Sequence, residues 1–194
     1  MLSTTTSAVG SGSLLMNGST HITLANTALT PFSSTQSQTI SIWFNCSSAT
    51  PNASTIMCPY LLAYNYTYTL NSIAIKNAGT NLLTIERSNF GAQYLSLAGI
   101  GTFGINTWQH YAMTVSNNSA GNWAIKNYFN GSLFSTATTT GLATSSSSSF
   151  IGSGQTAVMG YNGDSNFIGN VDDFRVYSYA LTATQISSIY NKTE

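Results

Sequence analysis

The chain has 194 residues, of which only 5 are Lys or Arg and 5 are Asp or Glu, so its formal net charge is zero. About a quarter of the residues of an ordinary globular protein are charged, and binding to a phosphate backbone needs clustered Lys and Arg, so nucleic-acid binding is excluded. Because 42% of the residues are apolar, the chain can bury a core, and its length fits one domain over residues 1–194.

The N-terminal region shows neither the basic start nor the apolar stretch of a secretory signal, so no signal peptide is predicted. No apolar run approaches the roughly 20 residues that a membrane span needs, so no membrane insertion is expected. Residues 1–13 are rich in Ser, Thr and Gly and are expected to form a flexible arm.

Most of the chain shows an apolar pattern with a period of two. In Thr39–Asn45, the residues Ile40, Ile42 and Phe44 share one face, as a half-buried strand requires. Further strands are predicted at His21–Leu24, Leu61–Leu70, Ser72–Lys76, Leu82–Arg87, Tyr94–Leu97, Trp108–Val115, Trp123–Phe129, Phe150–Ile151 and Phe167–Tyr177. Many short strands at this spacing predict an all-β sandwich or barrel.

Two local motifs predict a hairpin and a helix. Asn130-Gly131 lies between two apolar stretches, and this dipeptide favours a tight type I′ turn, in which both central residues have positive φ. Thr182 lies three residues before Gln185, with Leu181 and Ile186 on either side. This is the spacing of a capping box with a hydrophobic staple, and it predicts one short C-terminal helix.

The two cysteines, Cys46 and Cys58, fall at the ends of what look like neighbouring strands. Their spacing is compatible with one disulfide and equally with two thiols. A disulfide would indicate an oxidising environment.

Six segments resemble, in their order, the laminin-G-like, concanavalin A-like lectin/glucanase superfamily. They are Leu14–Leu24, Thr39–Phe44, Trp108–Val115, Tyr128–Leu133, Phe150–Gly152 and Phe167–Thr182, which the predicted helix follows. The resemblance implies a jelly-roll of two antiparallel sheets packed face to face. It also implies a binding or adhesion module more often than a catalyst.

Hydrolysis of glycosides requires a pair of carboxylates on the two sides of the scissile bond. Glu86 has no acidic residue within two positions, and the remaining acidic side chains are Asp164, Asp172, Asp173 and Glu194. No catalytic residue is therefore assigned, and the chain is not expected to be an enzyme.

Laminin-G-like relatives often hold Ca²⁺ at the rim of the sandwich, and the resemblance implies Asp164, Asp172 and Asp173 as the candidate ligands. Carboxylates and carbonyls are the oxygen donors that Ca²⁺ prefers. The alternative is that the Asp172-Asp173 pair caps backbone amides and that Asp173 pairs with Arg175 in solvent. No other cofactor is expected.

A row of tyrosines could form a sugar-binding platform. Tyr64, Tyr66 and Tyr68 share one face of a predicted strand, and aromatic rings in a row can stack on sugar rings. Trp123, after a Gly-Asn turn, is a further candidate at the rim. The alternative is that the alternating aromatic residues belong to the core.

Seven Asn residues begin an N-x-[ST] sequon, close to the number that chance gives in so Ser- and Thr-rich a chain. They are Asn17, Asn45, Asn52, Asn65, Asn117, Asn130 and Asn191. They become glycosylation sites only where the chain meets a glycosylating enzyme.

Two functions fit these observations. The first is a non-enzymatic, lectin-like module at the cell exterior that recognises glycans or a glycoprotein surface. The second is a structural protein that decorates a virus or phage particle or a cell-surface layer and packs against neighbouring proteins or copies of itself, which the neutral net charge would favour.

Overall fold

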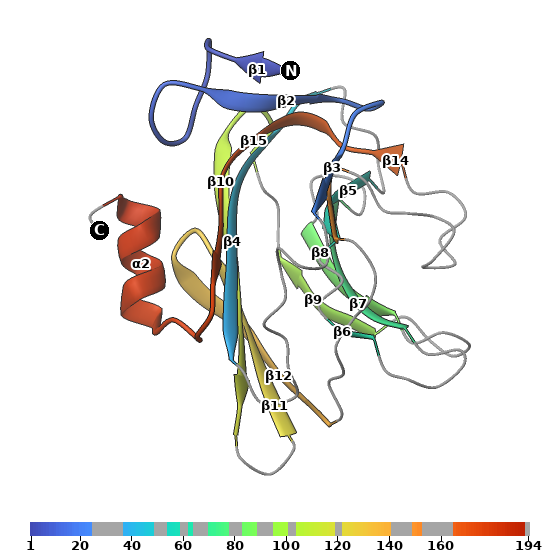
Figure 1. The fold of residues 1–194 in the computed structure, drawn as a ribbon, viewed down its shortest axis with the longest axis vertical. Coiled ribbons are helices and arrows are strands. Elements are labelled where there is room, and N and C mark those ends of the chain that lie inside the picture. The colour runs from blue at the N-terminus through green and yellow to red at the C-terminus, as the bar shows by residue number, and fades with distance from the viewer. Residues whose placement is uncertain are drawn as a thin grey trace.

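The computed structural model describes residues 1–24, 37–48, 54–58, 62–63, 70–77, 83–88, 95–100, 104–118, 122–140, 149–152 and 165–192. Two sheets face each other, with a helix on the outer side of one of them (Figure 1). The first sheet has the order β1 (Leu2–Ser3), β2 (Ser13–Asn17), β15 (Ile168–Tyr177), β4 (Gln38–Cys46), β10 (Trp108–Asn117), β11 (Asn122–Phe129) and β12 (Ser132–Thr140). We call it the seven-stranded sheet.

The second sheet has the order β3 (Ile22–Leu24), β13 (Ser149–Ile151), β5 (Ser54–Cys58), β7 (Leu70–Asn77), β8 (Leu83–Ser88) and β9 (Leu95–Ile100). The short strands β14 (Ser165–Asn166) and β6 (Leu62–Ala63) pair with β5 and β7. In the described residues, all strand pairs are antiparallel except β14 with β5. The predicted all-β sandwich is confirmed.

The core lies between the sheets and follows the predicted alternation. Ile40, Ile42 and Phe44 of β4 are fully buried on the inner face, next to Tyr111 and other apolar residues of β10. The buried Tyr111 hydroxyl donates to Asn127 Oδ1 over 2.7 Å, and Asn127 Nδ2 donates to Ser135 Oγ over 2.9 Å. These polar groups are therefore satisfied inside an apolar core.

The predicted hairpin joins β11 to β12. Asn130 has φ +47° and Gly131 has φ +78°, as a type I′ turn requires. The Asn130 side chain accepts from the His110 backbone N–H and donates to Gln109, each over 2.8 Å. A Cβ on Gly131 would lie 2.9 Å from the Tyr190 ring, so glycine also allows the helix to approach this turn.

The predicted helix is α2 (Ala183–Asn191), and its capping box between Thr182 and Gln185 is formed. Ile186 and Ile189 are buried together with Leu181 in a second cluster on the outer face of the seven-stranded sheet. The helix therefore covers that face, as Figure 1 shows.

Residues 1–13 were expected to form a flexible arm, and the structure instead has them packed against the sandwich. β1 pairs with β2, and the Ser13 hydroxyl donates to the Thr6 carbonyl over 2.7 Å. Trp108 Nε1 donates to Thr6 Oγ1 over 3.0 Å. These partners lie far along the chain or in the adjoining strand, so composition alone did not reveal them.

The basis of the disulfide prediction is wrong. Cys46 lies in β4 of the seven-stranded sheet and Cys58 in β5 of the other sheet, so the two strands are not neighbours. Cys46 is a buried free thiol, and burial raises its pKa to about 12. The structure describes the backbone of β5 but not the side chain of Cys58.

Candidate functional site

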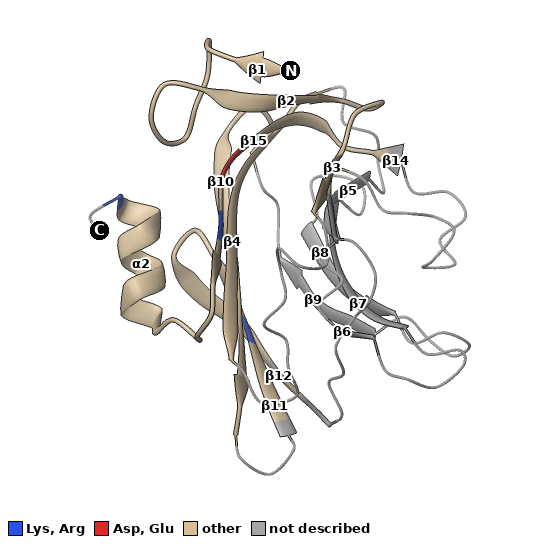
Figure 2. Ribbon diagram, in the orientation of Figure 1, with Lys and Arg blue, Asp and Glu red and all other residues tan. Residues whose placement is uncertain are grey.

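Most of the charged residues whose side chains the structure describes lie on β15 and at the end of α2 (Figure 2). There are five of them, and all but Lys126 lie where the N-terminal segment meets β15 and the end of α2: Asp172, Asp173, Arg175 and Lys192. We call these four residues the charged cluster. In a chain with so few charges, this grouping marks a first candidate site.

Asp172 binds the N-terminal segment through hydrogen bonds to its backbone. Its Oδ2 accepts from the backbone N–H groups of Ala8 and Val9 over 2.8 and 2.9 Å, and its Oδ1 accepts from the Asp173 N–H over 2.8 Å. Lys192 Nζ donates to the Ala8 carbonyl. The same dipeptide is thus held by a carboxylate from β15 and an ammonium from the end of α2.

Asp173 sits at a bulge of β15, with φ +45°. Its Oδ1 forms an ion pair with Arg175 Nε over 2.7 Å, and both side chains are partly exposed. The hydrogen bond that Arg175 donates to the Asp173 carboxylate raises the pKa of Arg175. Arg175 Nη1 also donates to the Tyr177 hydroxyl over 3.4 Å.

An aromatic group lies beside the charged cluster, on the outer face and next to α2. The Trp43 ring stacks on Tyr190 at 5.6 Å, and Lys192 Nζ lies 5.1 Å from the Trp43 ring centroid. His110 packs against Trp43 at 5.1 Å and is 1% exposed. Burial lowers the pKa of His110 to about 4, with a smaller opposing effect of Asp173.

Ser41, His110 and Asp173 lie on this same outer face, yet they do not form a catalytic triad. The Ser41 hydroxyl, both His110 nitrogens and Asp173 Oδ2 have no hydrogen-bond partner, so the three side chains are not joined. Ser41 and His110 are also buried. A nucleophile and base need mutual hydrogen-bond reach and access to substrate.

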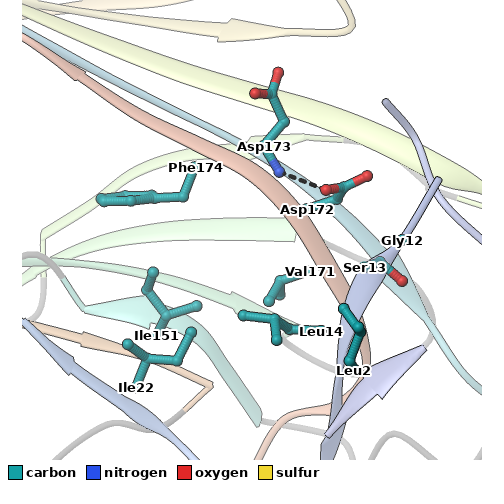
Figure 3. Close-up of a pocket in the computed structure, with 10 residues that line it drawn as sticks. All are labelled: Leu2, Gly12, Ser13, Leu14, Ile22, Ile151, Val171, Asp172, Asp173 and Phe174. Atoms are coloured by element: carbon teal, nitrogen blue, oxygen red, sulfur yellow. Dashed lines mark hydrogen bonds between the residues drawn. The ribbon is translucent and has the colours of Figure 1, made fainter. Parts of the chain in front are cut away.

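A second candidate lies between the sheets. A cavity of about 140 Å³ opens where β1, β2 and β15 meet β3 and β13. Its wall is mostly apolar, and the apolar side chains of the two sheets face one another there (Figure 3): Leu2, Leu14, Ile22, Ile151, Val171 and Phe174. No local sequence pattern had pointed to these residues.

The predicted sugar-binding residues are only partly described. Trp123 is 2% exposed and belongs to the main core cluster, so the prediction that it binds ligand at the rim is wrong. Its alternation with Ile125 was the signal that placed it on the inner face. Tyr64, Tyr66 and Tyr68 lie outside the described residues.

The predicted calcium ligands do not come together in the described part of the chain. Asp172 caps backbone amides and Asp173 pairs with Arg175, as the alternative interpretation proposed. No group of three His, Cys, Asp or Glu side chains that could hold a metal occurs among the described residues. Asp164 lies outside them.

Comparison with known families decides the fold. The family model described as "Concanavalin A-like lectin/glucanases superfamily" matches residues 16–187. The chain belongs to this superfamily. The jelly-roll expected from the six segments is thereby confirmed, and no curated protein sequence matches this member of the superfamily.

Solved structures show the same fold at low identity. Domain 4 of AbnA, an extracellular arabinanase from Geobacillus stearothermophilus, in complex with arabinotriose, has a TM-score of 0.70 and 19% identity, with coverage of 98% of this chain and 81% of that one. The binding domain of Paraclostridial Mosquitocidal Protein 1 gives 0.59 and 16%, with coverage of 99% and 45%. This concanavalin A-like chain therefore spans less than half of the latter structure.

A third structure is the CBM40 of the Ruminococcus gnavus IT-sialidase bound to alpha2,3 sialyllactose. It has a TM-score of 0.57 and 14% identity, with coverage of 80% of this chain and 83% of that one. Among the described residues of this concanavalin A-like chain, no helix has the length and apolar character to cross a membrane.

The sequons of this superfamily member differ in their surroundings. Asn17 is exposed and Asn191 lies at the exposed end of α2, whereas both ends of the Asn130 amide are hydrogen-bonded. Asn45 and Asn117 are half-buried, and Asn52 and Asn65 lie outside the described residues. Asn17 Oδ1 accepts from the Ser19 and Thr20 backbones, which leaves its Nδ2 as the atom open to modification.

Proposed function

We propose that this chain is a non-catalytic carbohydrate-binding module that works outside the cell. The observation that supports this most is the family match over residues 16–187, together with the likeness over nearly the whole chain to an arabinanase domain in complex with arabinotriose. A CBM40 bound to sialyllactose has a similar fold. Both are sugar-bound parts of enzymes, an arabinanase and a sialidase, and we extend the role of sugar binding to this chain.

The carboxylates of the described region favour binding over hydrolysis. A glycosidase needs one carboxyl group to protonate the leaving oxygen and a second to attack or to activate water. Asp172 already accepts three backbone N–H groups, and Asp173 is paired with Arg175. Asp172 is therefore engaged with the backbone and Asp173 with Arg175, which favours a structural role for both carboxylates.

We propose Tyr64, Tyr66 and Tyr68 as the sugar-stacking row, on the strength of their alternation in the sequence. A binding screen with arabino-oligosaccharides, sialyllactose and a broad glycan array tests the function. It is run with millimolar Ca²⁺ and again with a chelator, because Asp164 remains a proposed calcium ligand. A reducing-sugar assay on the same glycans checks for hydrolysis.

We expect saturable binding without product release. Tyr66→Ala should weaken binding about tenfold or more, if one sugar-stacking ring contributes about as much as the 1–3 kcal/mol measured for a nucleic-acid base stacked on an aromatic side chain. Thr67→Ala, next to it on the opposite face of the predicted strand, is the matched control. Sugar release at a catalytic rate, or no binding to any glycan, would contradict the proposal.

The alternative of a decorating protein on a particle or cell-surface layer receives no support from the comparisons. It predicts no glycan affinity and a buried protein interface of roughly 1,200–2,000 Å². Absence of glycan binding combined with self-association in solution would favour it.

A further inference from the structure

The cavity between the sheets has a buried floor and an exposed rim. Ile151 and Val171, which form the floor, are 2% and 3% exposed and belong to the main core cluster. Leu2 and Leu14 form the rim and are 67% and 39% exposed. The two leucines are register partners on β1 and β2, so they line the mouth from one side.

Most polar groups at the edge of the cavity are bonded elsewhere, and only Asp173 Oδ2 among those described lacks a partner. The Ser13 hydroxyl donates to Thr6 and accepts from Asn170, and the Asp172 carboxylate accepts three backbone N–H groups. The Asp173 carboxylate points away from the apolar side chains (Figure 3) and is paired with Arg175. A polar occupant such as a sugar ring would thus lose its hydrogen bonds to water and gain few in return.

The volume of the cavity limits the size of the group that it can bind. Its volume of about 140 Å³ is close to that of engineered apolar cavities, about 150 Å³, that stay dry and bind benzene or xenon. A firmly held water needs two to four polar partners, and six of the ten lining residues present apolar side chains instead. An apolar ring in this space would contact apolar side chains of both sheets.

The ribbon that carries the rim residues Leu2 and Leu14 is rich in exposed apolar side chains. Among the described residues, four of the seven exposed large hydrophobic side chains lie on the β1–β2 ribbon: Met1, Leu2, Leu14 and Leu15. Such a concentration on an otherwise polar surface is typical of binding regions.

From the wall, the volume and the exposed rim together, we propose that this cavity is a binding site for one apolar group of the size of a six-membered carbon ring. The site binds an unsubstituted aryl or cycloalkyl ring. It is separate from any sugar-binding surface. The proposal does not depend on the proposed function, because it concerns a cavity that would exclude the sugar itself.

The test is a titration of the full chain with benzene, in which each step is monitored by methyl-resolved ¹H–¹³C NMR. We expect saturable shifts confined to the methyl groups around the cavity, in Ile22, Ile151, Val171 and Leu14. The same titration with 1,4-dioxane, a ring of equal size that carries two ether oxygens, should give no saturable shift. Equal binding of both rings, or no saturable shift with benzene, would overturn the proposal.

A pair of variants locates the site. Leu14→Asp places a carboxylate at the rim and should weaken benzene binding at least tenfold. Leu15→Asp is the matched control, since Leu15 is the next residue of β2 with almost the same exposure, 37% against 39%, and does not line the cavity. Equal weakening by both variants, or binding unchanged in Leu14→Asp, would refute this location, and circular dichroism checks that both variants are folded.

Discussion

Replacement of Asp172 by Ala should loosen the N-terminal segment and lower the stability of the sandwich. The variant removes the acceptor of the Ala8 and Val9 N–H groups, which come from a segment more than 160 residues away in sequence. A hydrogen bond to a charged group contributes about 1.5 kcal/mol at the low end of the measured range, so the two bonds together amount to about 3 kcal/mol. For a chain of this length, that loss corresponds to a fall in Tm of roughly 6–12 °C.

Urea unfolding gives the global loss, and amide hydrogen exchange gives the local one. Because the segment lies at the edge of the sheet, we expect the exchange of Ala8 and Val9 to accelerate even where global stability changes less. Asp173→Asn is the matched control. It removes only a partly exposed ion pair with Arg175, and it should cost less than about 1 kcal/mol.

The reasoning would be refuted if Asp172→Ala stayed within about 0.5 kcal/mol of the wild type, the usual range for surface substitutions, while Ala8 and Val9 stayed protected.

Four further outcomes are expected. The pKa of His110 is about 4 in the fold against 6.5 for the free side chain, so the unfolded chain takes up the proton first as the pH falls. Its contribution is complete above pH 6.5 and declines toward pH 4, by up to about 3 kcal/mol. His110→Gln should flatten the urea-stability profile in this window, and an unchanged profile would contradict this. Cys46, buried with its pKa raised to about 12, should resist iodoacetamide until the urea transition, and early labelling of its tryptic peptide would show that the core opens locally. Asn130→Ala removes the bonds to His110 N–H and Gln109 and places Ala at φ +47°; a loss of about 2 kcal/mol in urea unfolding is expected, and an unchanged stability would mean that the turn tolerates another residue. Glycan affinity should change less than twofold between 20 and 500 mM NaCl by calorimetry, because the described charged cluster is engaged within the fold, and a steep salt dependence would contradict this.

Short sequence patterns predicted those parts of the fold that are determined by residues close together in the sequence. Alternation placed Ile40, Ile42 and Phe44 inside, Asn130-Gly131 formed the expected turn, and the capping box at Thr182 began the helix. Each of these features is decided by residues within a few positions of one another. Strand β2 was missed as a strand because Ser13–Asn17 carries no strict alternation.

Features that depend on contacts between residues far apart in the sequence were not predicted. The sequence contains no sign that Asp172 would meet Ala8 and Val9, because the contact exists only once β15 lies beside the N-terminal segment. The cavity has the same origin, since Leu2 and Ile151 meet only across the two sheets. Trp123 is different: its place on the inner face followed from the alternation with Ile125, and the Gly-Asn turn before it suggested the rim instead.

The distribution of charge links the stability of this fold to the way it can recognise a ligand. Asp172 and Lys192 hold the N-terminal segment, while Asp173 and Arg175 hold each other, so these charges act between parts of the fold. The rest of the described surface consists mainly of hydroxyl, amide and apolar groups. Neutral donors and acceptors can bind hydroxyl groups with little loss of hydration energy, whereas charged groups must be desolvated at greater cost. A nearly uncharged surface of this kind therefore suits a neutral, hydroxyl-rich partner better than an ionic one.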